Sequence, residues 1–265
     1  MSYKLIYFDI DGTLVDGNRT ILPSTLEALD RLRKAGIGIG IATGRMPVSA
    51  HPYVEAAKAD APLILYNGAR IQNFKTGEVH FNRNLPIRHA LRAIRLLAEF
   101  DIHCNCYVGD ELYIDSVTER AEAFMAKENL SANPVGDLTA FLTEDPVKLL
   151  LIGESDELQA FREDYVRGES DLPHIVQSEP SYLELMATET TKGSALAEVS
   201  ALSDVPLDEI VAFGDGPNDI EMIEAAGLGI AMGNAHPALK AKADVIAGMN
   251  DTDAISEVLD WCILE

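Results

Sequence analysis

The feature that most constrains this fold is an alternation of apolar runs with helical patterns, found at both ends of the chain but not in its middle. Near the start, Leu5–Phe8 is a continuous apolar run, as expected for a parallel strand that is buried on both faces. Leucines at positions 26, 29 and 32 then recur at helical spacing up to Gly36, where the helix is predicted to end. Two further strands and a hairpin are predicted at residues 37–41, 62–66 and 70–81.

The same alternation resumes from Lys192 onward. Helices are predicted at residues 193–202, 218–226, 236–241 and 252–263, and strands at residues 210–213 and 228–231. Strands that alternate with helices form parallel sheets with helices on both faces. We therefore predict an α/β fold in which both ends of the chain build one doubly wound, Rossmann-like parallel sheet.

The pattern changes after Pro86. The middle of the chain mixes hairpins with helices; its predicted helices are 87–100 and 118–129, and its predicted strands are 102–108, 111–114, 147–152, 174–177 and 182–186. A mixture of this kind is typical of a separate α+β domain, and about 100 residues is a normal domain size. We predict a core made of residues 1–85 and 187–265, with an inserted α+β domain at residues 86–186.

Three polar loops follow three of the predicted core strands: Asp9–Thr13, Thr43–Arg45 and Gly214–Asp219. Ligands of open parallel sheets bind beyond the carboxyl ends of the strands, so adjacent strands would bring these loops to one crevice. Four carboxylates gathered there, those of Asp9, Asp11, Asp215 and Asp219, would repel one another unless they shared a cation. The sequence therefore predicts Mg²⁺ as the cofactor.

The residue types in these loops suit phosphate chemistry. Asp9 and Asp11 are two positions apart at a strand end, so their side chains are expected to project the same way. One can then attack and bind metal while the other handles protons. Thr43 offers a hydroxyl and Gly44 an unshielded amide to a phosphate oxygen. Lys192 begins a helix, where a cation opposes the helix dipole unless an anion lies nearby. Taken singly, each motif also fits a solvated acidic turn, a helix cap or a surface lysine.

Taken together, these motifs resemble a known family. DIDGTL, ATGR, the lysine of TKG and FGDGPNDIEMI match, in order and spacing, the four motifs of the haloacid dehalogenase-like phosphatases. The stretches YNGA, YLEL and AMGNAHPALK resemble the Cof-type branch of that family. Members of this branch carry a large α/β cap between the second and third motifs, and the resemblance implies that residues 86–186 are such a cap.

The resemblance also implies roles for individual residues. Asp9 would be the nucleophile and a metal ligand, Asp11 the general acid and base that lends its backbone carbonyl to Mg²⁺, and Asp215 the remaining metal ligand. Asp219 would orient a metal-bound water or Lys192. The groups expected to hold the phosphoryl group are those of Ile10, Thr43, Gly44, Lys192 and Asn218. Weaker candidates for the rim between cap and core are Asn67, Tyr182 and Glu184.

The activity implied is Mg²⁺-dependent hydrolysis of small phosphomonoesters, such as sugar phosphates, through an aspartyl phosphate. A phosphosugar mutase of the same superfamily is one alternative. A non-catalytic regulator that binds phosphometabolites is another, although binding alone does not need both Asp9 and Asp11. The residues of the inserted domain give no readable code for the substrate.

Composition narrows the choice of partner. A net charge of −22 counts against nucleic acid and anionic membranes, because both require a basic surface. No apolar run approaches the roughly 20 residues of a membrane-spanning helix, and the first apolar stretch is too short for a signal peptide. The three cysteines, at positions 104, 106 and 262, do not suggest a disulfide framework. We expect a cytoplasmic protein, a monomer or small homo-oligomer, with a small phosphorylated metabolite as its partner.

Overall fold

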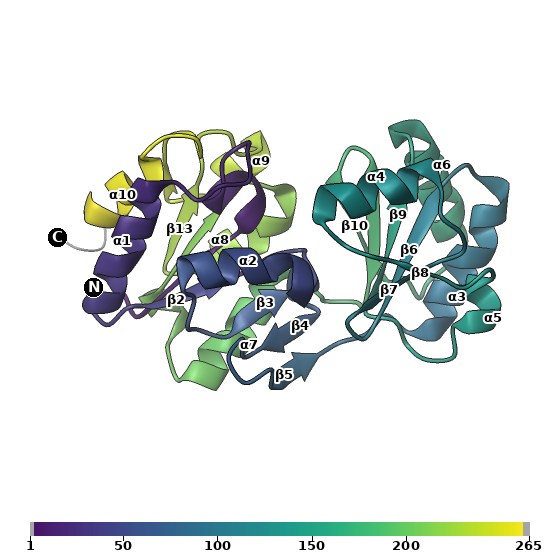
Figure 1. Cartoon of the computed structure of the whole chain (residues 1–265), viewed down its shortest axis with the longest axis horizontal. Helices are drawn as coiled ribbons and strands as arrows, with labels where there is room; N and C mark the ends of the chain where they lie inside the picture. The colour runs from purple at the N-terminus through teal and green to yellow at the C-terminus, as the bar shows by residue number, and fades with distance from the viewer. Residues whose placement is uncertain (1–2, 262–265) are drawn as a thin grey trace. The chain divides into compact units, whose positions relative to one another are not determined.

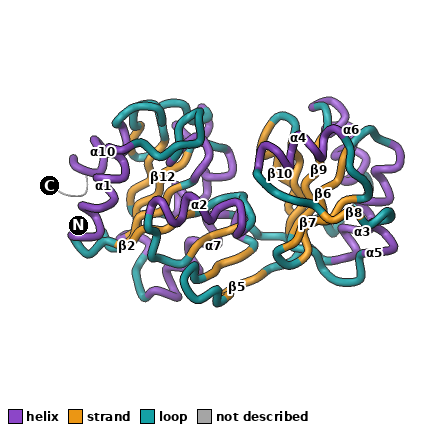
Figure 2. Tube along the Cα trace, viewed as in Figure 1, coloured by secondary structure: helices purple, strands orange, loops and turns teal. Residues whose placement is uncertain are grey.

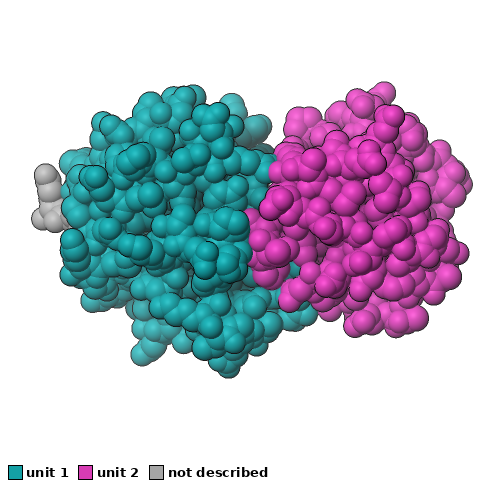
Figure 3. Space-filling model, viewed as in Figure 1, with its two compact units in different colours: residues 1–45, 50–82, 191–265 teal, residues 46–49, 83–190 magenta. Residues whose placement is uncertain are grey.

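The structure is a computed structural model that describes residues 3–261, and it divides the chain into two compact units (Figures 1 and 3). Unit 1 comprises residues 1–45, 50–82 and 191–265, and unit 2 comprises residues 46–49 and 83–190. Cys262 and the last residues of the predicted helix 252–263 lie outside the described residues.

Unit 1 is built on a parallel sheet. In the described part of the chain its strands are, in spatial order, β14 (Val245–Ile246), β13 (Leu228–Ala231), β12 (Ile210–Gly214), β1 (Leu5–Phe8) and β2 (Gly38–Ile41). All neighbouring pairs run parallel. The chain leaves β1 toward β2 on one side and returns to β12 on the other, so the strand order reverses at β1. The predicted α/β class with a doubly wound parallel sheet is confirmed.

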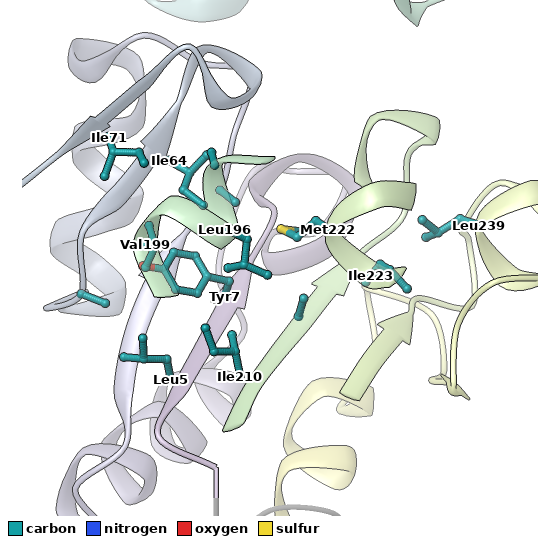
Figure 4. Close-up of a cluster of buried hydrophobic side chains, with 14 of the residues drawn as sticks. Leu5, Tyr7, Ile64, Ile71, Leu196, Val199, Ile210, Met222, Ile223 and Leu239 are labelled. Atoms are coloured by element: carbon teal, nitrogen blue, oxygen red, sulfur yellow. The ribbon is translucent and has the colours of Figure 1, made fainter. Parts of the chain in front are cut away.

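Helices cover both faces of this sheet. Leu5 and Tyr7 of β1 belong to one apolar cluster with Leu196 and Val199 of α7 (Lys192–Ser203) and with residues of α8 (Ile220–Ala225), as Figure 4 shows for the labelled side chains. Side chains alternate along a strand, so Ile6 and Phe8 point to the opposite face, and they too have no exposed surface. Helices α1 (Pro23–Lys34) and α10 (Ala254–Leu259) lie side by side (Figure 2). Burying each large apolar side chain contributes about 1.5–3 kcal/mol.

Unit 1 also contains a small antiparallel sheet. Its strands are β3 (Leu63–Leu65), β4 (Arg70–Gln72) and β5 (Val79–Asn82), and α2 (Pro47–Ala57) precedes it in the chain. The predicted hairpin at 70–81 is therefore present as β4 and β5. The predicted strand 62–66 belongs to this small sheet rather than to the main one, to which it is linked by a parallel bridge between Ile64 and Ala42.

Unit 2 has its own mixed sheet and core. The order of its described strands is β10 (His174–Glu179), β11 (Tyr182–Met186), β9 (Lys148–Ile152), β6 (His103–Val108), β7 (Glu111–Ile114) and β8 (Asn133–Pro134). One face, which includes Cys104, Cys106 and Leu149, packs into a cluster with residues of α3 (Ile87–Leu96), α5 (Leu138–Phe141) and α6 (Ser155–Val166). Helix α4 (Glu119–Glu128) meets the other face, where Phe124 lies edge-on to Tyr182.

Differences from the predicted elements are local. The predicted helix 87–100 is α3 followed by a 3₁₀ turn at Leu97–Glu99, and the predicted helix 218–226 is a 3₁₀ turn at Pro217–Asp219 followed by α8. The predicted helix 236–241 is the short α9 (Pro237–Lys240). The sequence patterns did not reveal α5, β8 and β14, because two to four residues are too few to display a hydrophobic period. None of the helices in the described residues has the length and apolarity needed to cross a bilayer.

Candidate active site

The three polar loops predicted from the sequence follow β1, β2 and β12, which are neighbours in the sheet. Parallel strands end at the same edge, so the loops emerge together at the point where the strand order reverses. Glycine at position 214 allows the third loop to turn closely: a Cβ atom there would lie 2.6 Å from the Cβ atom of Asp219. The sheet thus gathers residues from both ends of the chain.

Lys192 lies between the residues that these loops bring together. Its side chain has no exposed surface, and its Nζ donates to Asp9 Oδ1 at 2.6 Å and to Asp219 Oδ1 at 2.5 Å. Helix α7 begins at Lys192 because Thr191 caps it: Ser194 donates its backbone N–H to Thr191 Oγ1 at 3.0 Å, and the hydroxyl of Ser194 accepts from the Thr191 N–H at 3.1 Å. The two carboxylates supply the anions that a cation at a helix start requires.

Asp219 is fully buried and both of its oxygens are engaged. Oδ1 accepts from Lys192, and Oδ2 accepts from the backbone amides of Asp215 and Gly216 at 3.0 and 2.9 Å. Asp215 is held in turn by Thr13, whose hydroxyl donates to Asp215 Oδ1 at 2.9 Å. Asp219 therefore shapes the loop that carries Asp215 and anchors the lysine. No role for Thr13 was expected from the sequence, although Thr13 directly follows Gly12 in the first loop.

Burial and crowding perturb the acids strongly. Burial is the main reason why the pKa of Asp9 lies well above its usual value; the charge of Lys192 opposes this, and the nearby carboxylates add to it. Burial and the charge of Asp219 raise the pKa of Asp215 to about 7. Burial alone would lower the pKa of Lys192, but its two carboxylate partners outweigh burial and raise it. Lys192 therefore stays protonated, and its single positive charge only partly balances the charges of the surrounding carboxylates.

This donor set fits a hard divalent cation. Each of Asp9, Asp215 and Asp219 offers a carboxylate oxygen, and the three oxygens lie within 4.8 Å of one another. Carboxylate oxygens are the preferred protein ligands of Mg²⁺. A cation among them would offset the repulsion that raises the pKa values of Asp9 and Asp215. Because both oxygens of Asp219 already accept hydrogen bonds, Asp9 and Asp215 have the more available ligand atoms.

Asp11 points to a different partner from Asp9. Arg45 donates from Nε to Asp11 Oδ2 at 2.7 Å and from a terminal nitrogen to Asp11 Oδ1 at 2.6 Å. Burial raises the pKa of Asp11, but the hydrogen bonds and charge of Arg45 outweigh it and hold the pKa below its usual value. The guanidinium of Arg45 also lies 5.1 Å from the ring centre of Tyr53. No role for Arg45 was expected from the sequence, although its position directly after Thr43 and Gly44 could have suggested one.

The predicted phosphate-binding residues lie around this centre. Thr43 is buried after β2, and its hydroxyl accepts from the Arg45 N–H at 3.2 Å. Asn218 lies in the third loop and donates to Asn67 Oδ1 at 3.0 Å. The carbonyl of Ile10 accepts from the Val15 N–H at 3.2 Å, and its side chain is buried. Their predicted roles remain predictions.

The three candidate rim residues lie in different settings. Asn67 belongs to unit 1 and is 2% exposed, next to the predicted phosphate-binding residues. Tyr182 and Glu184 lie on β11 of unit 2. The Tyr182 hydroxyl accepts from Lys127 at 3.3 Å, and Glu184 forms a buried ion pair with Lys148 at 2.5 Å. A role for Tyr182 and Glu184 in substrate binding remains a prediction.

Comparison with known proteins agrees with this chemistry. The profile of a family described as haloacid dehalogenase-like hydrolase matches residues 6–259. The chain is 33% identical over 269 residues to pyridoxal phosphate phosphatase YbhA of Escherichia coli (strain K12), covering 98% of each chain. It is 30% identical over 262 residues to 5-amino-6-(5-phospho-D-ribitylamino)uracil phosphatase YitU of Bacillus subtilis (strain 168), covering 96% of each. Among solved structures it is similar to TM0651 from Thermotoga maritima, with a TM-score of 0.86, 30% identity and 97% of each chain covered.

Proposed function

Since this chain belongs to the haloacid dehalogenase-like hydrolases and is a phosphatase of the Cof-type branch, we propose that it hydrolyses small phosphomonoesters with Mg²⁺ bound, through a phosphorylated Asp9. The proposed substrates are sugar phosphates or similar metabolites. The two curated relatives are named for different phosphorylated compounds, so family membership leaves the physiological substrate open.

The observation that carries this proposal is the position of Lys192 between Asp9 and Asp219. A carboxylate and a phosphate monoester are both anions and repel each other as they approach. The ammonium of Lys192 offsets that repulsion, and because it has no exposed surface its charge acts more strongly than it would in water. Asp9 can then attack phosphorus in line with the departing alcohol.

When bound, Mg²⁺ would supply positive charge at the transferring phosphoryl group, held by the carboxylates of Asp9 and Asp215 and by the backbone carbonyl of Asp11. Thr43, Gly44, Asn218 and the backbone near Ile10 would hold the phosphoryl oxygens. Asp219 would keep Lys192 and Asp215 in place through the contacts described above.

Asp11 would carry the proton. It would protonate the departing alcohol in the first step and take a proton from water in the second, so that water hydrolyses the phosphorylated Asp9. In this structure Arg45 holds both oxygens of Asp11. That ion pair would have to open and Asp11 would have to take up a proton before it can donate one to the departing alcohol.

We assign substrate selection to residues 86–186, the predicted cap. Its support is that every group proposed to act on phosphorus belongs to unit 1, whereas unit 2 has a separate sheet and core. A domain that carries no chemical group can still favour one leaving group over another. Deleting this segment would test the assignment by comparing metabolites with a small aryl phosphate.

A panel of phosphorylated metabolites, assayed for released phosphate with Mg²⁺ present, tests the function. We expect phosphate release from at least one phosphomonoester and none from the same panel with Asp9→Asn. Equal release by Asp9→Asn would exclude Asp9 as the nucleophile. Transfer of phosphate to a second sugar position, without release, would identify a mutase instead.

A further inference from the structure

The turn that follows β3 has an unusual backbone. Tyr66, Asn67 and Gly68 have φ values of +52°, +54° and +102°, so three successive residues adopt the left-handed region. Asparagine tolerates this conformation, but for a bulky aromatic residue it is a true outlier. For a residue other than glycine such a conformation is strained, and it persists only where surrounding contacts enforce it.

The contacts that hold this turn are made to the loop that contains the predicted phosphate-binding residues Thr43 and Gly44. The N–H of Tyr66 donates to the carbonyl of Arg45 at 3.1 Å, and the N–H of Asn67 donates to the carbonyl of Thr43 at 2.9 Å. The turn thus fixes the backbone on either side of Gly44. Tyr66 itself is completely buried, so its strained conformation is held by packing as well as by the hydrogen bond.

The third residue of the turn packs on the helix that carries Lys192. A Cβ atom on Gly68 would lie 2.2 Å from the carbonyl oxygen of Thr191, the residue that caps α7. Only glycine permits this approach. One short turn therefore touches the second polar loop and the start of α7.

The side chain of Asn67 contacts two of the predicted phosphate-binding residues. Its Oδ1 accepts from Asn218 Nδ2 at 3.0 Å, and its amide lies so close to Gly44 that a Cβ atom there would be 3.0 Å from Oδ1. Asn67 is 2% exposed, so this amide has little freedom to move. The amide nitrogen of Asn218 has two N–H bonds, and the contact with Asn67 uses one, which leaves the other for a phosphoryl oxygen.

We propose that Asn67 is a positioning residue for phosphoryl transfer, whose side chain acts by fixing the amide of Asn218. The inference rests on the proposed function, because it concerns the same phosphate site. In this role the Asn67 side chain acts through Asn218. It limits the rotation of the Asn218 amide, so that less order has to be imposed when phosphate binds.

The first test separates the side chain from the backbone. Asn67→Gly keeps the left-handed conformation, which glycine adopts without strain, and removes only the amide. The matched control is Asn129→Gly, because Asn129 also has a left-handed φ of +53°, is exposed and ends α4 in unit 2. We expect Asn67→Gly to lower kcat/KM for p-nitrophenyl phosphate by roughly 10-fold and to weaken binding of inorganic phosphate by a similar factor. Asn129→Gly should stay within twofold of wild type in both.

The second test is a double-mutant cycle with Asn218→Ala. If Asn67 acts through Asn218, Asn67→Gly should change phosphate affinity less than about threefold once the Asn218 amide is absent. Independent, multiplying effects would overturn the inference, as would an Asn67→Gly variant that equals wild type. If the wild-type protein binds inorganic phosphate but releases none from any ester, the proposed function fails while the binding cycle still decides the role of Asn67.

Discussion

Replacing Lys192 by methionine should destabilise the protein strongly and in a pH-dependent way. Methionine has a similar length and no charge, so the substitution leaves Asp9 and Asp219 buried without their shared cation. Breaking a buried ion pair from one side costs about 3–5 kcal/mol. For a protein of this size each kcal/mol corresponds to roughly 2–4 °C in Tm, so we expect a decrease of roughly 6–20 °C at pH 8.

The sign of the pH dependence follows from the acids. The pKa of Asp215 is raised to about 7 and that of Asp9 lies well above its usual value, so these two acids bind more protons in the folded protein than in the unfolded chain. Their contribution to stability therefore falls as pH rises from about 4 through 7. In Lys192→Met the opposing charge is gone, the pKa of Asp9 should rise further, and the loss should be smaller at pH 5 than at pH 8. Lys192 itself stays protonated throughout this range and adds no slope.

The assay is urea or thermal unfolding at pH 5 to 8 with a chelator present. Lys242→Met is the matched control, because Lys242 pairs with Glu224 at 2.6 Å on the surface of the same unit, where such pairs contribute about 0–1 kcal/mol. A loss below about 1 kcal/mol at pH 8 for Lys192→Met, or losses that are equal for the two variants, would refute the reasoning.

Three further predictions concern the metal, the two aspartates and the turn. A chelator should abolish phosphate release and Mg²⁺ should restore it, with Ca²⁺ much less effective; full activity in chelator would contradict the metal site. In rapid-quench labelling with an aryl phosphate, Asp9→Asn should form no phosphoenzyme, whereas Asp11→Asn should accumulate it and should slow turnover of sugar phosphates by roughly 10²–10⁴; label on Asp11 would reverse the assignment. Gly68→Ala should lower Tm far more than Gly77→Ala, because both residues have positive φ but only Gly68 faces a backbone oxygen at 2.2 Å; equal shifts would show that backbone strain alone decides.

Much of the fold could be predicted because its signals are local. Leu5–Phe8 forms the predicted strand, and Leu29 and Leu32 of α1 are buried, since burial on one or both faces leaves a recognisable pattern in the sequence. The strand at 62–66 shows the limit. Its apolar pattern indicated a strand, but no local pattern states which sheet a strand will join.

The sequence alone determined which chemical groups follow which strands, and with them the family. It did not determine which groups pair. Asp9 and Lys192 are separated by 183 positions in the chain, and Asn67 and Asn218 by 151. Their contacts exist because the order of β2, β1 and β12 and the packing of α7 bring their loops to one edge.

The clearest case is the Asp9–Asp11 pair. A spacing of two predicted that both side chains would project alike, yet Asp9 meets Lys192 while Asp11 meets Arg45. The backbone between and after them leaves the extended conformation, with Gly12 at a φ of +78°, so strand alternation ends at Asp9. Residue spacing sets the direction of a side chain only within a regular element, and these two aspartates lie where the strand ends.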